Sequence, residues 1–458
     1  MKLNIKQLTP YLIALITFII VSLAYFSPVL EGEKIYQSDI AQHLGMSKEI
    51  KDFREQNHEE PYWTDAAFGG MPAYQVSAYF PHDYLRKLDK IVRYLPRPAD
   101  YLMLYFLGFF VLMMVLKVDW RLAILGSLAF GFSTYLIIIL GVGHNAKAHA
   151  IGYMPLVLAG VLLVFQKKYL VGFALTTLTA SLELAAGHIQ MTYYLFFMLL
   201  ILGGVYLVDA FKNKQLSDFI KSGVVLLVAA VLSVMINANH LLPIREYSKV
   251  STRGTSELTI TPDGKPKKIA TGLSKEYITE YSYGILETFN LFIPRLMGGG
   301  NSENLGTDSH TYDFLKKKIG VAQAKDFVKR APTYWGTQPI VAAPAYIGAV
   351  LIFLFVLSLF IVDTKTKKWL VGSIILALLL SWGKNLSPLT NFFIDYVPLY
   401  TKFRAVSSIQ VLIELAIPIL AILGLQKILF DETITIKKKE KSIKHTTIIT
   451  GGIALFFY

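Results

Sequence analysis

The polar residues best suited to chemistry stand next to long apolar stretches of the sequence. Asp39 follows Ser38 shortly after the first apolar run, and His43 comes one helical turn later. A carboxylate in a partly dry cleft accepts a proton from a hydroxyl group, which makes Asp39 the candidate general base. Two other roles stay open for Asp39, capping a helix or complementing its dipole. Asp39 and His43 together also form a weak motif for a divalent cation such as Mg²⁺ or Mn²⁺, with an interface histidine that makes one hydrogen bond as the favoured alternative for His43.

Two further polar groups occupy tight junctions between consecutive apolar runs. They are Gly143-His144-Asn145-Ala146-Lys147 and Gly187-His188-Ile189-Gln190. Ionisable groups near membrane depth are costly, so those that occur there tend to mark substrate paths. We therefore expect His144, Lys147, His188 and Gln190 to bind substrate, with contact to lipid headgroups as the alternative for Lys147. Glu183 lies one turn before the second junction and is expected to support the same cavity.

A third set of candidates lies later in the chain. Lys402 and Arg404 stand just before an apolar run that begins near Ile409. A guanidinium group binds phosphate through two parallel hydrogen bonds, so this pair predicts an anionic ligand, with lipid headgroups as the alternative. Glu287 and Trp335 lie in two aromatic, glycine-containing segments, 283–288 and 334–339. Such rings either stack on sugars or form the aromatic belt of a membrane interface, so both residues are supporting candidates.

The composition indicates the class of protein that must position these residues. The chain has 458 residues, of which 54% are hydrophobic and 17% are charged. Since about 25% charged is usual for soluble proteins, the sequence predicts a multi-pass membrane protein. The net charge of +13 comes largely from Lys and Arg in short loops between apolar runs, which argues against nucleic acid as a partner. The absence of cysteine excludes disulfides and thiol chemistry.

The apolar runs predict an all-α bundle of about eleven or more transmembrane helices. Runs of spanning length fall near 10–30, 101–117, 122–141, 150–166, 169–186, 191–208, 223–243, 344–362, 369–383 and 408–426. A further run begins near Thr446 and stops at Tyr458, which predicts that this helix continues beyond the given sequence. We expect one membrane domain over 1–458, with the first helix in 1–30, helices 2–7 in 101–243 and helices 8–11 in 344–458. Two large extracytoplasmic loops, 31–100 and 244–343, separate these groups.

The loop charges predict the orientation in the membrane. With a cytoplasmic N-terminus, the basic loops at 117–121, 167–168, 212–221, 365–368 and 427–444 all face the cytoplasm, as the positive-inside rule requires. The candidate site residues then face the extracytoplasmic side. ATP and nucleotide sugars are cytoplasmic, so a substrate on this side is expected to be attached to a lipid already.

The first large loop carries two patterns typical of interfacial helices. Apolar residues recur at helical spacing from Ile40 to Phe53, with charged residues between them. In the second pattern, Leu85 to Leu95 alternate with Arg86, Lys87, Lys90 and Arg93, which suits contact with anionic membrane lipids. Packing against the bundle is the other interpretation of the apolar faces.

Taken together, these segments resemble the YfhO-like bacterial membrane proteins, a branch of the GT-C class of polytopic glycosyltransferases. The resemblance rests on Ser38-Asp39, Trp63-Thr64 with Phe68-Gly69-Gly70-Met71-Pro72, Gly143-His144 with Lys147, Gly187-His188-Ile189-Gln190, Tyr334-Trp335-Gly336-Thr337-Gln338-Pro339 and Phe403-Arg404-Ala405. It implies a GT-C-like fold in the bacterial cytoplasmic membrane and sugar transfer on the outer face. The donor would be a polyprenyl-phosphate-linked sugar and the acceptor a glycan, lipid or protein of the cell envelope.

The resemblance also implies that Asp39 serves as the base or as a metal ligand. The acidic pair of the class is absent, because Ser38 precedes Asp39 and Ile40 follows it. Two other functions stay open, a flippase or transporter for lipid-linked glycans and a non-catalytic membrane protein of envelope assembly. A flippase would carry charged residues deep in its spans, so the one-sided polar set favours the enzyme.

Overall fold

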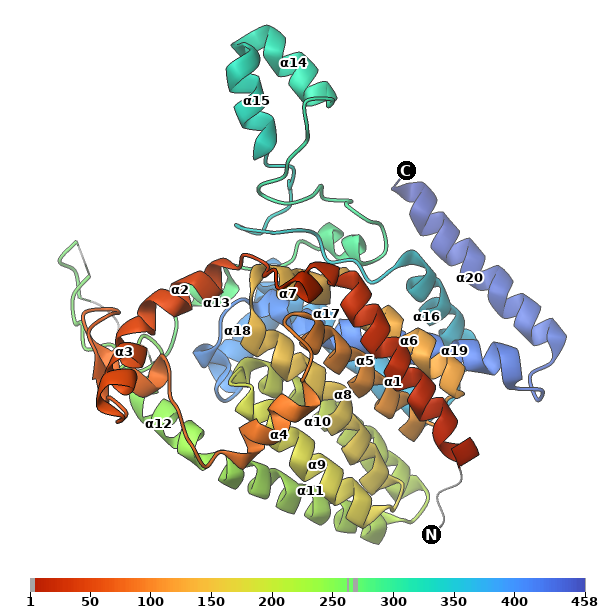
Figure 1. Cartoon of the computed structure of the whole chain (residues 1–458). Helices are drawn as coiled ribbons and strands as arrows, with labels where there is room; N and C mark the ends of the chain where they lie inside the picture. Colours follow the sequence, from red (N-terminus) through yellow and green to blue (C-terminus); the bar gives the residue numbers. More distant parts are fainter. Residues whose placement is uncertain (1–4, 262, 267–270, 458) are drawn as a thin grey trace. The chain divides into compact units, whose positions relative to one another are not determined.

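The computed structural model describes residues 5–261, 263–266 and 271–457, most of them in helices (Figure 1). Two compact units make up the chain. The first comprises Met1–Leu116, Ile139–Thr192 and Ile220–Tyr247, and the second comprises Lys117–Ile138, Tyr193–Phe219 and Ser248–Tyr458. The all-α class predicted from the apolar runs is confirmed for the described residues, whose single sheet is a hairpin of two short strands.

The first unit combines long apolar helices with short helices of the loop at 31–100. Its elements are α1 (Ile5–Tyr25), η1 (Ser27–Glu31), α2 (Ser38–Met46), α3 (Lys48–Asn57), β1 (Trp63–Thr64), β2 (Met71–Pro72), η2 (Ala73–Gln75), α4 (Tyr84–Val92), α5 (Ala99–Val115), α8 (Asn145–Phe165), α9 (Tyr169–Ala185) and nearly all of α12 (Ala238–Ser248). Three helices contribute to both units: α7 (Thr134–Val142), α10 (Ile189–Lys212) and α11 (Leu216–Ile236).

The second unit holds the remaining elements. They are α6 (Trp120–Gly131), α13 (Lys275–Thr279), η3 (Leu286–Leu291), α14 (His310–Ile319), α15 (Val321–Lys329), α16 (Ala349–Ile361), α17 (Lys365–Ser381), η4 (Gly383–Leu386), α18 (Ser387–Tyr396), η5 (Tyr400–Lys402), η6 (Val406–Gln410), α19 (Val411–Phe430) and α20 (Ile436–Phe456). Helix α19 is buried along most of its length, and the carboxylate of Glu414 inside it accepts hydrogen bonds from Ser133 and Gln410.

Long apolar helices indicate a multi-pass membrane protein, but they are fewer than the sequence predicts. Five helices of the described chain are long and apolar enough to cross a membrane, or up to seven if each of two bent pairs is one span. The prediction of about eleven or more spans is therefore wrong. The runs at 101–117, 169–186 and 344–362 form α5, α9 and α16, with 17, 17 and 13 residues, whereas a span needs about 20. The runs at 122–141 and 369–383 belong to the bent pairs, whose bends are 50° and 105°.

Helices α8 and α9 form the antiparallel pair that positions the junction residues. They approach closely, since a Cβ added to Gly160 of α8 would lie 2.5 Å from the hydroxyl oxygen of Thr176 on α9. Small residues allow such backbone contact between membrane helices. Because the two helices are antiparallel and joined by a short turn at Lys167 and Lys168, the first residues of α8 and the last residues of α9 lie at the same end of the pair.

The Trp63-Thr64 and Phe68–Pro72 motifs form the β1–β2 hairpin, in which Trp63 pairs with Pro72 and Thr64 with Met71. Glu49 of α3 holds the hairpin in place. Its carboxylate accepts hydrogen bonds from the Thr64 hydroxyl at 2.7 Å and from the backbone N–H groups of Asp65 and Ala66 at 3.2 and 3.0 Å. This motif therefore has a structural role, since it forms a hairpin that is held against α3 within the loop at 31–100.

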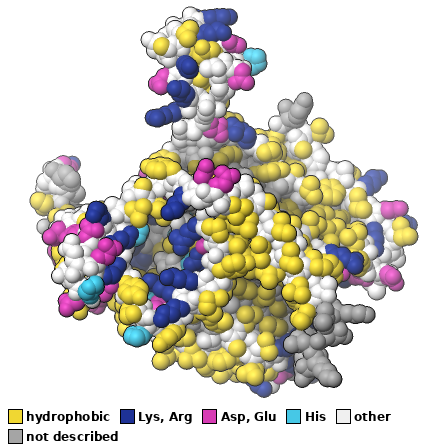
Figure 2. All heavy atoms as spheres, in the orientation of Figure 1, with side chains coloured by type: hydrophobic (Ala, Val, Ile, Leu, Met, Phe, Trp, Pro, Cys, Tyr) yellow, Lys and Arg dark blue, Asp and Glu magenta, His cyan; other side chains and the backbone are white. Residues whose placement is uncertain are grey.

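Side chains are sorted by polarity within the units. In Figure 2, charged side chains gather over α2 and α3 and over the hairpin of α14 and α15, while hydrophobic side chains cover α1. Helices α1 and α11 expose many of their apolar residues, among them Ile16, Ile20, Leu227 and Met235. Such exposed apolar faces suit contact with lipid.

The orientation gives the first testable prediction, because a chain without cysteine can be labelled at one introduced site. Asn57, Lys325 and Lys438 are exposed. We expect Asn57→Cys and Lys325→Cys to react with a membrane-impermeant thiol reagent in intact cells, and Lys438→Cys to react only after permeabilisation, since its lysine-rich segment should face the cytoplasm. Labelling of Lys438→Cys in intact cells would overturn this orientation.

Candidate functional site

A close contact between α2 and the turn before α8 brings Asp39 to the first junction. Gly143 has a φ of +89°, and a Cβ at this position would lie 2.8 Å from the Gln37 side chain. Only glycine fits both the left-handed backbone and this contact at low cost. The Gln37 side-chain amide donates a hydrogen bond of 2.5 Å to the carbonyl of Leu140, which fixes the start of α2 against the end of α7.

The side chains of Asp39 and His144 face each other at this contact. The Asp39 carboxylate lies 3.4 Å from Nε2 of His144, and each side chain is about half exposed, at 50% and 49% respectively. Asp39 occupies the first turn of α2, and His144 is the residue immediately before α8. The half-exposed carboxylate is therefore accessible to a substrate hydroxyl, the first requirement of a general base.

His188 comes from the second junction, in the turn between α9 and α10. Burial, followed by the positive charge of Lys147 and then that of His144, lowers the pKa of His188 to about 4. The imidazole is therefore neutral at pH 7. Its Nδ1 atom and the side-chain oxygen of Asn145 are buried without a hydrogen-bond partner among the described residues. Buried polar atoms are nearly always paired, so both junctions are prepared for a polar ligand or water.

His188 makes the second prediction, a loss of stability in mild acid. Its folded pKa lies below the unfolded value of 6.5, so the unfolded chain binds the proton more readily. The contribution of neutral His188 to the free energy of unfolding is complete above pH 6.5. It falls as the pH drops towards 4, by up to about 1.4 kcal/mol per pH unit. The free energy of unfolding in detergent, measured between pH 7 and pH 4.5, should fall less steeply for His188→Gln. Identical slopes for both proteins would contradict the lowered pKa.

The other candidates of the first unit lie close to these residues along the chain. Glu183 is buried near the end of α9, and both of its carboxylate oxygens accept a hydrogen bond from the Thr192 hydroxyl of α10, at 2.9 and 2.7 Å. It therefore joins the two helices at the second junction. Gln190 is half-buried in the first turn of α10. His43 follows Asp39 by four residues on α2, and burial and the charge of Lys51 lower its pKa.

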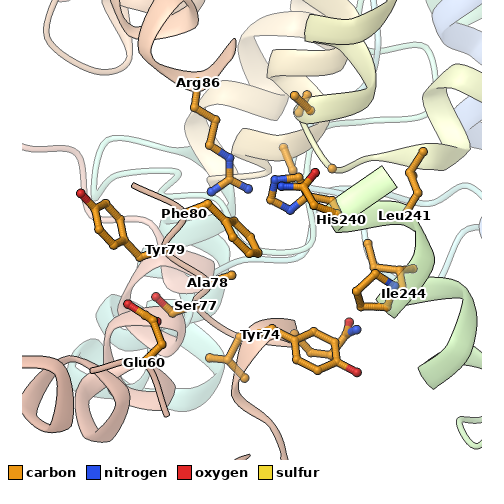
Figure 3. Close-up of a pocket in the computed structure, with 18 of the residues that line it drawn as sticks. Glu60, Tyr74, Ser77, Ala78, Tyr79, Phe80, Arg86, His240, Leu241 and Ile244 are labelled. Atoms are coloured by element: carbon orange, nitrogen blue, oxygen red, sulfur yellow. The ribbon is translucent and has the colours of Figure 1, made fainter. Parts of the chain in front are cut away.

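A cavity of about 670 Å³ lies next to both junctions in the first unit (Figure 3). We call it the aromatic cavity, because its wall from 60 to 80 carries Tyr62, Tyr74, Tyr79 and Phe80. Its other walls come from α4, α12 and the two junctions, including Ala146 and Gly187, and from His43 of α2. It has the volume typical of a site for a small molecule.

A buried charge cluster anchors α4, and the sequence did not predict it. Arg93 was expected among lipid headgroups, but its side chain is only 7% exposed and lies between two carboxylates. It donates hydrogen bonds to both carboxylate oxygens of Asp89 and one of 2.6 Å to Asp100. Asp89 also contacts His149 at 2.6 Å and accepts a hydrogen bond from Tyr153 at 2.7 Å. Burial alone would raise the pKa of Asp89, but His149 and Arg93 outweigh it and hold the pKa below its ordinary value.

The candidates of the second unit make contacts within that unit. The Arg404 guanidinium donates a hydrogen bond of 2.7 Å to the Tyr277 hydroxyl and lies over its ring. Lys402 binds the backbone carbonyl of Arg253, and Arg253 binds that of Lys402. These contacts fix the loop before η6 to Arg253 and to Tyr277 of α13.

The two aromatic segments of the second unit meet at Glu287. Its buried carboxylate accepts hydrogen bonds from the Tyr334 hydroxyl at 2.7 Å, the Gln338 amide at 2.8 Å and the backbone N–H of Gly284 at 3.0 Å. Three such bonds satisfy a carboxylate well, so Glu287 has a structural role that joins the segments 283–288 and 334–339. Trp335, next to this contact, is 67% exposed.

Asp39 and His43 do not make a complete metal site. The part of the chain that the structure describes contains no group of three or more His, Asp or Glu residues that could hold an ion. Mg²⁺ is commonly held by one or two carboxylates together with water and substrate phosphates, so Asp39 and His43 would supply only part of the ligand set. Similarity searches with the whole chain matched no family of proteins, no curated protein and no solved structure.

Proposed function

We propose that the protein is a GT-C-like membrane glycosyltransferase that moves a sugar from a polyprenyl-phosphate-linked donor to a cell-envelope acceptor on the extracytoplasmic face. The observation that carries the proposal is the Asp39–His144 pair, 3.4 Å apart, at the end of the α8–α9 pair where Lys147 and His188 also lie. A carboxylate that can act as a base thus stands beside groups that can hold a phosphate. The proposal uses residues of the first unit only.

In the proposed reaction, Asp39 takes the proton from an acceptor hydroxyl. The acceptor oxygen attacks the anomeric carbon of the donor sugar, and the bond between that carbon and the phosphate oxygen breaks. The electron pair leaves with the polyprenyl phosphate. Because the acceptor attacks from the opposite face in a single displacement, the configuration at the anomeric carbon inverts. Lys147 stabilises the negative charge on the leaving phosphate. His144 holds Asp39 in place through the contact of 3.4 Å between its Nε2 atom and the carboxylate.

Neutral His188 has a separate role at the leaving phosphate. Its Nδ1 atom has no hydrogen-bond partner among the described residues. In the tautomer that carries hydrogen on Nδ1, this atom donates to a phosphate oxygen without the cost of burying a further positive charge beside Lys147. No step of the proposal needs a metal ion.

The experiment must separate transfer from transport, since a lipid-linked glycan flippase is the alternative. The purified protein is reconstituted in liposomes with a panel of polyprenyl-phosphate-linked monosaccharides and an extract of envelope glycans and lipids. Transfer releases free polyprenyl phosphate, which mass spectrometry detects, whereas a flippase moves the donor between leaflets and leaves it intact. Intact donor with protein-dependent leaflet exchange would replace the enzyme by the flippase.

A further inference from the structure

The aromatic cavity has the features of a binding site for a sugar. Three of its tyrosines present accessible rings, because Tyr62, Tyr74 and Tyr79 are 89%, 40% and 56% exposed. Flat aromatic faces offer large rigid contact area together with a hydroxyl group that can form hydrogen bonds. Figure 3 shows Tyr74 and Tyr79 on the wall of the cavity, together with Phe80 and Ser77. A ring-shaped polar molecule therefore finds both apolar surface and hydrogen-bonding groups here.

Two charged side chains, Arg86 and Glu60, line the aromatic cavity. Among the described residues that line the cavity, Arg86 is the only Lys or Arg and Glu60 is the only Asp or Glu. Glu60 is neutralised by Arg54, whose guanidinium donates two hydrogen bonds of 2.5 and 2.8 Å to its carboxylate. The guanidinium of Arg86 points into the cavity in Figure 3. Arg86 is itself paired with Asp83 through Nε, at 3.3 Å, so the preference for an anionic ligand rests on its inward guanidinium, a group that binds carboxylate and phosphate through parallel hydrogen bonds.

Arg86 is held in position by a carboxylate outside the cavity lining. Asp83, the residue that caps α4, lies 3.3 Å from Nε of Arg86 and 3.3 Å from Nε2 of His240. The His240 ring also packs edge-on against Phe80, at 4.7 Å between ring centres. Asp83 thus orients an arginine and a histidine towards the same space. Burial, followed by the charge of Arg86, lowers the pKa of His240 despite the opposing effect of Asp83, and Asp83 already engages its Nε2 atom.

The aromatic cavity also adjoins the proposed reaction site. His43 contributes to its lining and lies four residues after Asp39 on α2, and residues at this spacing share one face of a helix. Ala146 and Gly187 bring both junctions to the cavity wall. A sugar bound in the cavity therefore lies beside the helix face that carries Asp39.

We propose that the aromatic cavity binds an anionic sugar unit of the acceptor, with Arg86 on its carboxylate or phosphate group and the tyrosine rings against its pyranose face. Its identification as the acceptor site rests on the proposed function, but the binding of an anionic sugar does not. The planar guanidinium suits carboxylate and phosphate alike. The probes must therefore include one sugar of each kind.

The test is direct binding to the full-length Asp39→Asn protein, which does not depend on turnover. Glucuronic acid, glucose 6-phosphate and neutral glucose are the probes, and ligand-observed NMR measures their affinity in detergent. We expect the two anionic sugars to bind at least about tenfold more tightly than glucose. Arg86→Ala should weaken the anionic sugars by about tenfold to a hundredfold, the effect of losing a charge-assisted hydrogen bond, and leave glucose unchanged.

Matched variants separate an effect on binding at the cavity from effects of net charge and of folding. Lys90→Ala, on the same helix but exposed and outside the cavity lining, removes the same charge and should bind like the parent. Tyr74→Leu should weaken all three sugars alike, which keeps the test decisive if Arg86→Ala does not fold. Equal binding of glucose and the anionic sugars, unchanged binding by Arg86→Ala, or no binding of any probe would overturn the inference. Binding without any transfer activity would refute the proposed function alone.

Discussion

Replacing Arg93 by Met should destabilise the protein by about 3–5 kcal/mol, the usual cost of removing one partner from a buried ion pair. Arg93 lies between Asp89 and Asp100, which are 5% and 2% exposed. Methionine has a similar length, so packing changes little, but two buried carboxylates lose their main counter-charge. Asp89 keeps His149 and Tyr153, whereas Asp100 keeps only Arg97, at 3.7 Å, as a basic partner among the residues that the structure describes.

Arg97→Met is the matched control. Arg97 also faces Asp100 and lies over the Tyr101 ring, but its side chain is 55% exposed. Exposed ion pairs contribute about 0–1 kcal/mol, so this variant should unfold nearly like the parent. Unfolding in mixed detergent micelles measures both. Adding Asp89→Asn and Asp100→Asn to Arg93→Met should recover part of the loss. Equal stability of the two single variants would show that the buried cluster does not anchor α4.

Replacing Asp39 by Asn should lower sugar transfer by at least about a hundredfold, the scale expected for loss of a general base. Asparagine keeps the size and most hydrogen bonds of Asp39 but cannot take the acceptor proton. Loss of the charge in the first turn of α2 should cost only about 0.3–1 kcal/mol of stability. A large fall in activity with nearly unchanged folding is thus the signature of the base.

The same exchange at a neighbouring helix is the control for Asp39→Asn. Asp52 is an exposed acid on α3 that pairs with Lys48, so Asp52→Asn should transfer sugar at the parent rate. Initial rates at saturating donor and acceptor compare the variants. If Asp39→Asn keeps the parent rate, Asp39 only complements the helix dipole, and the base must be sought elsewhere.

The sequence predicts the long helices well, because their apolar runs leave no other way to satisfy the backbone in lipid. Helices α1, α8, α10 and α19 follow such runs. Breaks within the apolar runs were not predicted, because hydropathy carries no information about a bend in the backbone. The run at 122–141 contains no proline, yet Phe132 and Ser133 separate α6 from α7. Likewise, the amphipathic run after Asp39 is two helices, α2 and α3, which meet at Ser47.

The candidate site could be predicted in part from the sequence. Tight glycine-containing junctions predicted that His144 and His188 lie at one end of neighbouring helices. The cluster around Arg93 was missed, because helical spacing assigns this residue to a polar face and carries no information about its partners. A signal was present in Asp100, an acid at the start of an apolar run that needs a counter-charge when buried. Arg86 belongs to the same polar face but lines a cavity, and only tertiary structure distinguishes the two arginines.

The most direct test of the proposed transferase site is to find where the donor binds. A polyprenyl-phosphate-linked sugar that carries a photoreactive group on the sugar is added to the protein in liposomes, and the crosslinked peptides are mapped by mass spectrometry. We expect crosslinks in residues 37–43, 143–149 and 187–190, suppressed by an excess of unmodified donor. Donor-protected crosslinks confined to other segments, such as α14 and α15, would contradict a lipid-phosphate sugar site at Asp39 and His144.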